Sequence, residues 1–81
     1  MDQWLADLID ALLNEYAGQG IAWDEVGWDT KRRRLIAARW PASGQSEAMQ
    51  DHLAGRTEAD GGKWERMGRE IAAIKMVVPK V

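Results

Sequence analysis

Residues 21–41, IAWDEVGWDTKRRRLIAARWP, decide the fold class, because the same stretch fits either two strands or one helix. Tryptophan and β-branched residues are frequent in its first part, and the Asp-Thr-Lys sequence at residues 29–31 offers turn chemistry. Tryptophans lie on both sides of that turn, and aromatic pairs across two strands stabilise a hairpin. We therefore predict a β-hairpin with strands near residues 23–28 and 33–40.

A helix from Thr30 to Trp40 is the alternative interpretation of the same stretch. Leu35, Ile36 and the two alanines that follow them have good helix propensity. Gly27 interrupts the pattern just before the turn and favours the hairpin. Under the alternative, the whole chain is all-α and consists of four short helices.

The N-terminal segment predicts an amphipathic helix over residues 3–17. Its apolar residues recur at a spacing of three and four, as on one face of a helix. Asp2 is placed to act as the N-cap, and Gly18 and Gly20 end the helix. The apolar stripe consists of Trp4, Leu5, Leu8, Ile9, Leu12, Leu13 and Tyr16.

The C-terminal half predicts two more helices after a loop at residues 41–45. A short helix over residues 46–54 starts with Ser46 as its cap and ends at Gly55. Residues 57–60 have the form of a capping box, but the Gly61-Gly62 pair shifts the expected start of the last helix to about Lys63. Its apolar stripe continues to about residue 78, and a proline ends it.

Taken together, these elements predict one small α+β domain over residues 1–81. It consists of an N-terminal amphipathic helix, a central β-hairpin, a short helix and a C-terminal helix. The two long helices are expected to pack against each other and against one face of the hairpin. The predicted core consists of Leu5, Leu8, Ile9, Leu12, Val26, Leu35, Ile36, Leu53, Trp64, Met67, Ile71 and Ile74.

The residue types present exclude most catalytic chemistry. The chain has no cysteine, which removes disulfides, thiolate nucleophiles and cysteine-ligated zinc. His52 is the only histidine, the carboxylates lack the spacing of an EF-hand, and the glycine pairs are too short to cradle a phosphate. We therefore predict a protein that is not an enzyme, with no catalytic residue, no metal and no cofactor.

Charge is divided unevenly along the chain, although the formal net charge is only −2. Residues 1–30 contain seven acidic residues and no lysine or arginine. Residues 31–81 contain all 11 basic residues and the other six acidic ones (13 − 7 = 6). We expect the two halves to neutralise each other within the fold; otherwise they present opposite faces that steer a partner or favour self-association.

The functional prediction is a protein–protein interaction module, such as a small inhibitor or regulatory subunit. Size and charge are similar to those of the small inhibitors that phages and other mobile elements encode, an analogy of class only. Charged and aromatic residues are expected to form the interface, with Trp28 or Trp40 as an exposed anchor. The predicted partner-binding residues are Lys31, Arg32, Arg33, Arg34, Arg39, Trp28, Trp40, Asp7 and Asp10.

The sequence leaves two alternatives open for the partner. The basic run from Lys31 to Arg34 leaves a nucleic-acid-binding regulator as the alternative function, and a homo-oligomer is also open.

The N-terminus lacks the basic and apolar regions of a signal peptide. The longest apolar stretch, residues 71–78, is interrupted by Lys75 and too short to span a bilayer. We expect a soluble, cytoplasmic protein that does not associate with membranes.

Overall fold

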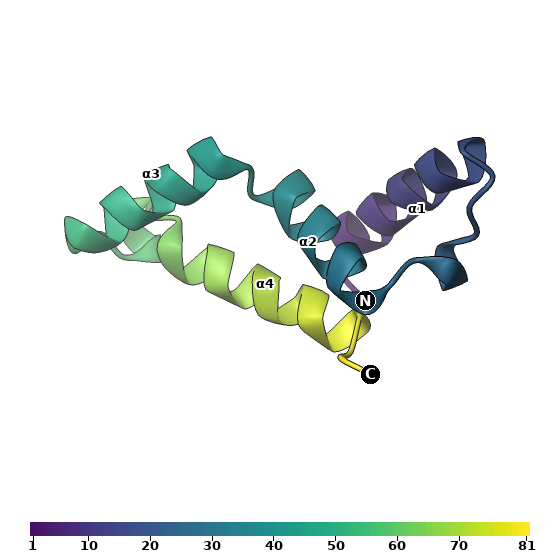
Figure 1. The fold of residues 1–81 in the computed structure, drawn as a ribbon. Coiled ribbons are helices and arrows are strands. Elements are labelled where there is room, and N and C mark those ends of the chain that lie inside the picture. The colour runs from purple at the N-terminus through teal and green to yellow at the C-terminus, as the bar shows by residue number, and fades with distance from the viewer.

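A computed structural model describes all 81 residues, and every regular element in it is a helix (Figure 1). The predicted α+β fold is therefore wrong, and the all-α alternative with four helices matches. No helix combines the length and the apolar content that crossing a bilayer requires. The elements, in chain order, are α1 (Gln3–Gly18), the 3-10 turn η1 (Trp23–Glu25), α2 (Trp28–Arg39), α3 (Ala42–Leu53), the 3-10 turn η2 (Glu58–Asp60) and α4 (Trp64–Val77).

The predicted strands at residues 23–28 and 33–40 are replaced by η1 and by the single helix α2. Gly27 has an extended backbone and precedes the first residue of α2, Trp28. Arg32 follows Trp28 by one helical turn, and its guanidinium lies 5.0 Å from the Trp28 ring. Trp28 thus has a cation partner within its own helix, and Trp23 of η1 has one on α2, Lys31, so cross-strand aromatic pairs are not needed.

The predicted loop at residues 41–45 is also wrong, because α3 already begins at Ala42. Pro41 precedes it with a φ of −62°, and its missing N–H costs nothing at the start of a helix. The Gln45 side chain donates a hydrogen bond of 2.7 Å to the Trp40 carbonyl and fixes the junction between α2 and α3. The expected stop is confirmed: α3 ends at Leu53, and Gly55 has a φ of +72°.

The segment before α4 follows the prediction. Thr57 and Asp60 form the expected capping box, on the short turn η2, and α4 begins next to Lys63. A side chain at Gly62 would lie within 3 Å of the carbonyl oxygens of Arg56 and Thr57. Glycine is therefore required at this position for the chain to turn from α3 into α4.

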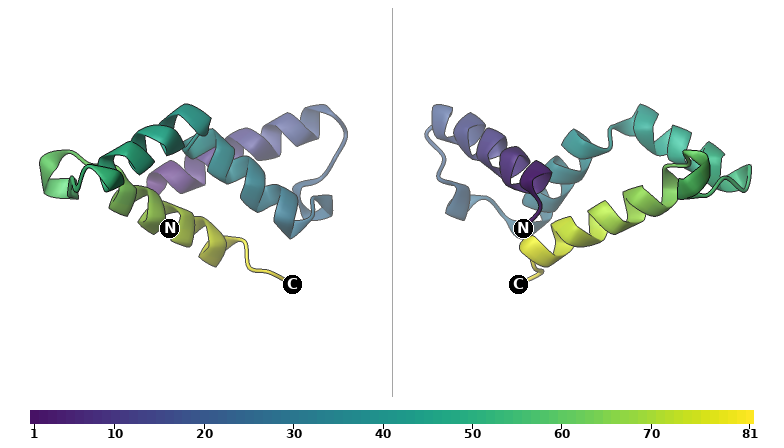
Figure 2. Two further views of the ribbon diagram at one scale, coloured as in Figure 1. Left: turned by 60° about the vertical axis from the view of Figure 1, so that its left-hand side comes forward. Right: turned by 180° about the vertical axis from the view of Figure 1, so that it is seen from behind.

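The molecule is elongated, measuring 45 × 22 × 21 Å (Figure 2). Its radius of gyration is 14.3 Å, whereas a compact chain of this length has a value of about 12 Å. One end is formed by α1 and η1 packed on α2, and the other by α3 and η2 packed on α4 (Figure 1). We call α3, η2 and the N-terminal half of α4 the arm.

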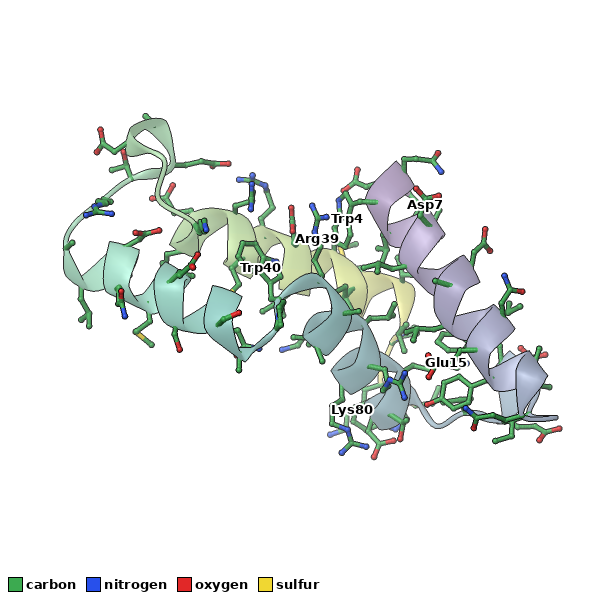
Figure 3. All side chains as sticks on the ribbon, turned by 90° about the horizontal axis from the view of Figure 1, so that it is seen from above. Trp4, Asp7, Glu15, Arg39, Trp40 and Lys80 are labelled. Carbon is green, nitrogen blue, oxygen red and sulfur yellow. The ribbon has the colours of Figure 1, made fainter.

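The core lies where α1, α2 and the C-terminal half of α4 meet. Leu35 and Ile74 are completely buried there, and Arg39 of α2 covers the Trp4 ring of α1 at 4.6 Å (Figure 3). The cluster consists of Leu5, Leu12, Leu35, Ile74 and Val78. The other predicted core residues are half-buried, namely Leu8, Ile9, Val26, Ile36, Trp64, Met67 and Ile71.

Leu53 is the exception among the predicted core residues, since 78% of it is exposed. The face that α3 turns to α4 carries a small and a polar residue, which an apolar pattern does not identify. Ala48 and Asp51 are the buried residues of α3, and they lie on the side that packs on α4. Leu53 consequently lies on the opposite face of the helix and points away from the rest of the molecule.

Candidate functional site

The predicted basic run lies on α2, and two of its arginines are used to hold the fold together. Arg32 donates hydrogen bonds to the carbonyls of Val78 (2.7 Å) and Lys75 (3.3 Å) at the end of α4. Pro79 has no N–H to offer the Lys75 carbonyl, so Arg32 supplies the missing donor. Arg34 donates to both carboxylate oxygens of Glu15 on α1, at 2.8 and 2.7 Å.

The other two members of the run differ in their surroundings. Lys31 is half-buried, and its ammonium lies 4.9 Å from the centre of the Trp23 ring. Arg33 is the only exposed member, and its one side-chain hydrogen bond is to Thr30, at 3.3 Å. The run is therefore not a continuous basic surface, although its sequence suggests one.

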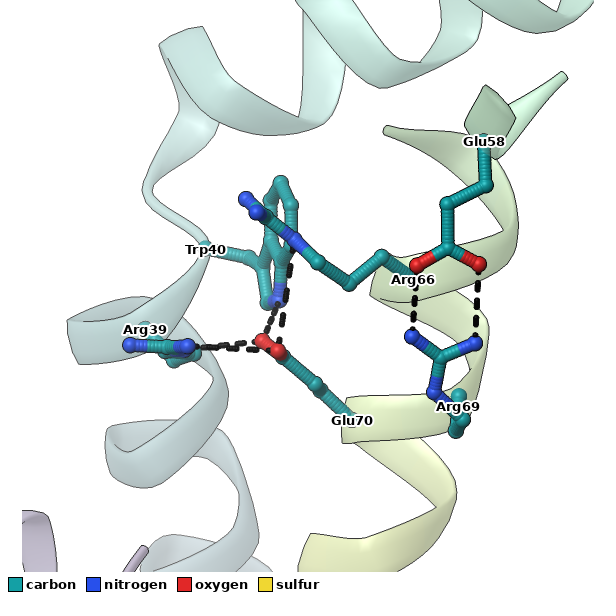
Figure 4. A network of polar contacts seen from close by, with 6 residues as sticks. All are labelled: Arg39, Trp40, Glu58, Arg66, Arg69 and Glu70. Atoms are coloured by element: carbon teal, nitrogen blue, oxygen red, sulfur yellow. Dashed lines mark hydrogen bonds and ion pairs between the residues drawn. The ribbon is translucent and has the colours of Figure 1, made fainter. Parts of the chain in front are cut away.

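Trp40 and Arg39, also predicted to bind a partner, meet Glu70 of α4 in a polar cluster (Figure 4). The Trp40 indole donates to the Glu70 carboxylate at 3.0 Å, and Arg39 donates to it twice, at 2.7 and 3.2 Å. Arg66 covers the Trp40 ring at 5.1 Å. Because only 4% of Trp40 is exposed, it cannot serve as an exposed anchor.

The hydrogen bonds from Arg39, together with its positive charge, hold the pKa of Glu70 below its usual range, although burial opposes this effect. Glu70 is thus more acidic in the folded chain than in the unfolded chain. Its contribution to stability is present above the unfolded pKa and is lost as the pH falls through the folded pKa. The pKa of the exposed Glu58 is lowered in the same way by the hydrogen bonds from Arg69.

The lowered pKa of Glu70 predicts a pH-dependent effect of Glu70→Gln. We expect the variant to be less stable than the wild type by a constant amount above about pH 5, and the difference to shrink below the unfolded pKa of about 4.3. Urea unfolding followed by circular dichroism at several pH values measures it. Glu58 is present in both chains, so its own titration cancels. A difference that does not change with pH would contradict the role given to Glu70.

Acidic residues of the arm are mostly paired. Glu58 accepts two hydrogen bonds from Arg69, and Glu47 pairs with Lys63. Asp51 accepts from Arg56 at 3.2 Å and from the Lys63 backbone at 3.1 Å. Five of the 11 basic residues of residues 31–81 thus form an ion pair with an acid of their own half, namely Arg39, Arg56, Lys63, Arg66 and Arg69.

The acidic residues of the N-terminal end form no ion pair, with one exception. Only Glu15, which binds Arg34, joins an acid of residues 1–30 to a base of the other half. The prediction that the two halves neutralise each other is therefore wrong for every acid of residues 1–30 except Glu15. We call α1, η1 and the first residues of α2 the acidic lobe. Its acids without an ion pair are Asp2, Asp7, Asp10, Asp24, Glu25 and Asp29.

Two of the predicted partner-binding residues lie on this lobe as exposed carboxylates. Asp7 (Figure 3) accepts one hydrogen bond, from the Gln3 side chain at 2.8 Å. Asp10 accepts none from another side chain. Both lie on α1 and face solvent. They are available to a partner without breaking a contact of the fold.

An apolar hollow opens in the same lobe, between η1, the start of α2 and the C-terminal tail. Its volume is about 460 Å³. Trp23 and Trp28 line it and are half-buried, and the carboxylates of Asp24 and Glu25 lie at its edge. Lys80 lies over the Trp28 ring at 5.7 Å. The remaining lining residues are Ile9, Val26, Gly27, Lys31, Val77, Val78, Pro79 and Val81.

The hollow was only partly visible in the sequence. The sequence predicts Trp28 as a contact residue, whereas it predicts no contact role for Trp23, Asp24 or Glu25, which fall in the predicted strand near residues 23–28. The sequence signal for the hollow is a pair of tryptophans, Trp23 and Trp28, with Asp24 and Glu25 between them.

No three potential metal ligands converge anywhere in the chain. Comparison with protein-family models, with curated proteins and with solved structures gave no match.

Proposed function

We propose that this chain is a non-enzymatic protein-binding module, acting as a small inhibitor or regulatory subunit. In this proposal the acidic lobe binds a basic segment of a partner protein, and the hollow receives an apolar side chain of that segment. One observation carries it: six carboxylates without an ion pair lie on the lobe that holds the apolar hollow, and two of them, Asp24 and Glu25, line that hollow.

The two features of the lobe have different physical roles. Carboxylates of one sign at the edge of an interface steer an oppositely charged partner and raise its association rate. Tryptophans in a hollow provide the apolar contacts that slow dissociation. Trp23 and Trp28 are half-buried, so each keeps part of its ring surface for such a contact. The lobe is thus suited to a partner that is both basic and apolar.

The state of the basic run supports a protein partner over a nucleic acid. Arg32 and Arg34 already donate to acceptors within the fold, so a phosphate would have to compete with them. A phosphate backbone would also meet the unpaired carboxylates of the lobe, which repel it. A basic protein segment meets neither obstacle.

Affinity capture from a nuclease-treated lysate of the source cell tests the proposal. The test variant is Asp24→Asn with Glu25→Gln at the hollow. The control is Asp60→Asn with Glu65→Gln on the arm, because it removes the same charges from residues that make no ion pair, and the amide oxygen introduced at position 60 can still accept the hydrogen bonds from Thr57. We expect one protein to be recovered with the wild type and the control, and several-fold less of it with the test variant.

The captured protein must then meet a second condition. Its association rate with the wild type is expected to fall steeply with added salt, and the test variant is expected to show a weaker salt dependence. Recovery that is equal for the test variant and the control would contradict the assignment of the lobe. Capture that disappears after nuclease treatment would instead support the nucleic-acid alternative.

A further inference from the structure

The outer face of α3 is exposed and free of charge, and it carries two large apolar side chains, Met49 and Leu53. Ala42, Ser46, Met49 and Leu53 follow each other at spacings of four, three and four residues and share one side of the helix. Met49 is 45% exposed and Leu53 is 78% exposed. This spacing is the one by which a helix presents a seam to another helix.

The charged residues of α3 lie on its other side. Asp51 is buried toward α4 and accepts from Arg56, while Glu47 pairs with Lys63. Gln45 and Gln50 flank the outer seam on its two sides. A shallow hollow of about 510 Å³ runs along this face. In a chain with 24 charged side chains (11 + 13), α3 thus turns a neutral surface to solvent.

We propose that a second copy of this chain covers the outer face of α3, with the two α3 helices antiparallel. In that arrangement Ala42 lies opposite Leu53 of the partner subunit, and Ser46 lies opposite Met49 of the partner subunit. Each large side chain then meets a small one, which allows the helices to interlock without a void.

The flanking amides also fit the antiparallel arrangement. The same register places Gln45 opposite Gln50 of the partner subunit, and two amides can donate to and accept from each other. A parallel pair would instead place like residues together, so that Leu53 meets Leu53 of the partner subunit and the two Ala42 methyls leave a gap. The face is thus self-complementary in one direction only.

Charge is the reason that a second copy fits this face and not the acidic lobe. Two acidic lobes repel each other, since six of their carboxylates have no ion pair. Two neutral faces do not, and antiparallel helices align their dipoles favourably. Self-association through α3 is therefore independent of the proposed binding of a partner by the lobe.

The small size of the α3 face limits the expected affinity of the dimer. α3 has 12 residues and is about 18 Å long. Two such helices bury less than the roughly 800 Å² per partner that stable complexes bury. We therefore expect a weak dimer with a dissociation constant between about 10 μM and 1 mM.

Sedimentation velocity of the full chain from about 10 μM to a few mM tests the dimer against that range. We expect the wild type to shift from monomer to dimer, and Met49→Glu to weaken the dimer about tenfold or more because it places a charge in the seam. Met76→Glu is the control, since Met76 is 83% exposed on α4. A wild type that stays monomeric throughout, or a control that weakens the dimer equally, would overturn the proposal.

Disulfide trapping tests the direction of the helices, and the absence of native cysteines makes the background clean. A mixture of the Ser46→Cys and Met49→Cys chains is oxidised gently at high concentration. Antiparallel helices should yield mainly the mixed disulfide. Mainly homodisulfides, or cross-linking no faster than for a chain with cysteine at position 76, would overturn the arrangement. High salt should leave this dimer intact, in contrast to binding through the acidic lobe.

Discussion

Leu35→Ala is expected to lower the free energy of unfolding by about 3 kcal/mol or more, one of the largest effects of a single truncation in this chain. Leu35 is completely buried where α1, α2 and α4 meet. Truncation removes apolar contacts and leaves a cavity that three helices surround. Because a chain of this size is stabilised by only about 5 kcal/mol, the variant should keep about 2 kcal/mol or less and unfold at less than half the urea concentration of the wild type. Urea unfolding followed by circular dichroism at 222 nm measures the loss.

Leu53→Ala is the matched control for that prediction. The substitution is chemically identical, but Leu53 is 78% exposed on the outer face of α3. At a concentration where the chain is monomeric, we expect a change within about 0.5 kcal/mol. Equal losses for the two variants would mean that the helices do not pack around Leu35.

Glu70→Ala is expected to cost about 2–3 kcal/mol, although it removes a charged and not an apolar residue. The carboxylate accepts one hydrogen bond from Trp40 and two from Arg39. Without it, the buried indole N–H of Trp40 has no acceptor, and the junction between α2 and α3 loses its tie to α4. The same urea experiment measures the loss.

Glu65→Ala provides the comparison on the same helix. Glu65 is exposed and makes no ion pair, so its truncation should change stability by about 0.5 kcal/mol or less. The Trp40 indole signal in an NMR spectrum should move in Glu70→Ala and stay in place in Glu65→Ala. If both variants lose equal stability, the hydrogen-bonded cluster does not hold α2 against α4.

Where apolar residues recur strongly at helical spacing, the sequence was sufficient to predict the element. This holds for α1 and α4, whose stripes face the shared core. It failed for α2, because Trp23 and Trp28 have high strand propensity, and the cations of α2 that cover their rings, Lys31 and Arg32, look in the sequence like a solvated basic run. Local propensity cannot distinguish these outcomes.

The start of α3 was missed for a related reason. Ala42, Ser43, Gly44 and Gln45 have the composition of a loop, and Gly44 is unfavourable within a helix. Packing of Gly44 against Trp40, at 3.5 Å from where a Cβ would lie, and of Ala48 against α4 stabilises the helix instead. Such contacts are between elements and have no signature in a single sequence.

The candidate site was predictable in its charge and not in its geometry. The acids of residues 1–30 are plain in the sequence, and Asp7, Asp10 and Trp28 do lie on the acidic lobe. Whether those acids form ion pairs depends on which groups the arginines of α2 contact in the fold. Arg39 turns to Glu70, and Arg32 turns to backbone carbonyls. Neither arginine is then available to the acidic lobe, whose acids other than Glu15 stay without an ion pair, although residues 31–81 still carry a net charge of +5 (11 − 6).

NMR of the indole N–H groups tests the role of the lobe most directly, because the chain's five tryptophans report from different places. The probe is a short peptide of alternating arginine and leucine, and its control alternates glutamate and leucine. We predict that at low salt the arginine peptide shifts the Trp23 and Trp28 signals, leaves the buried Trp40 signal in place, and acts more weakly on the Asp24→Asn, Glu25→Gln variant. Unmoved Trp23 and Trp28 signals at millimolar peptide, or equal shifts in that variant, would contradict the proposal that this lobe binds a basic partner.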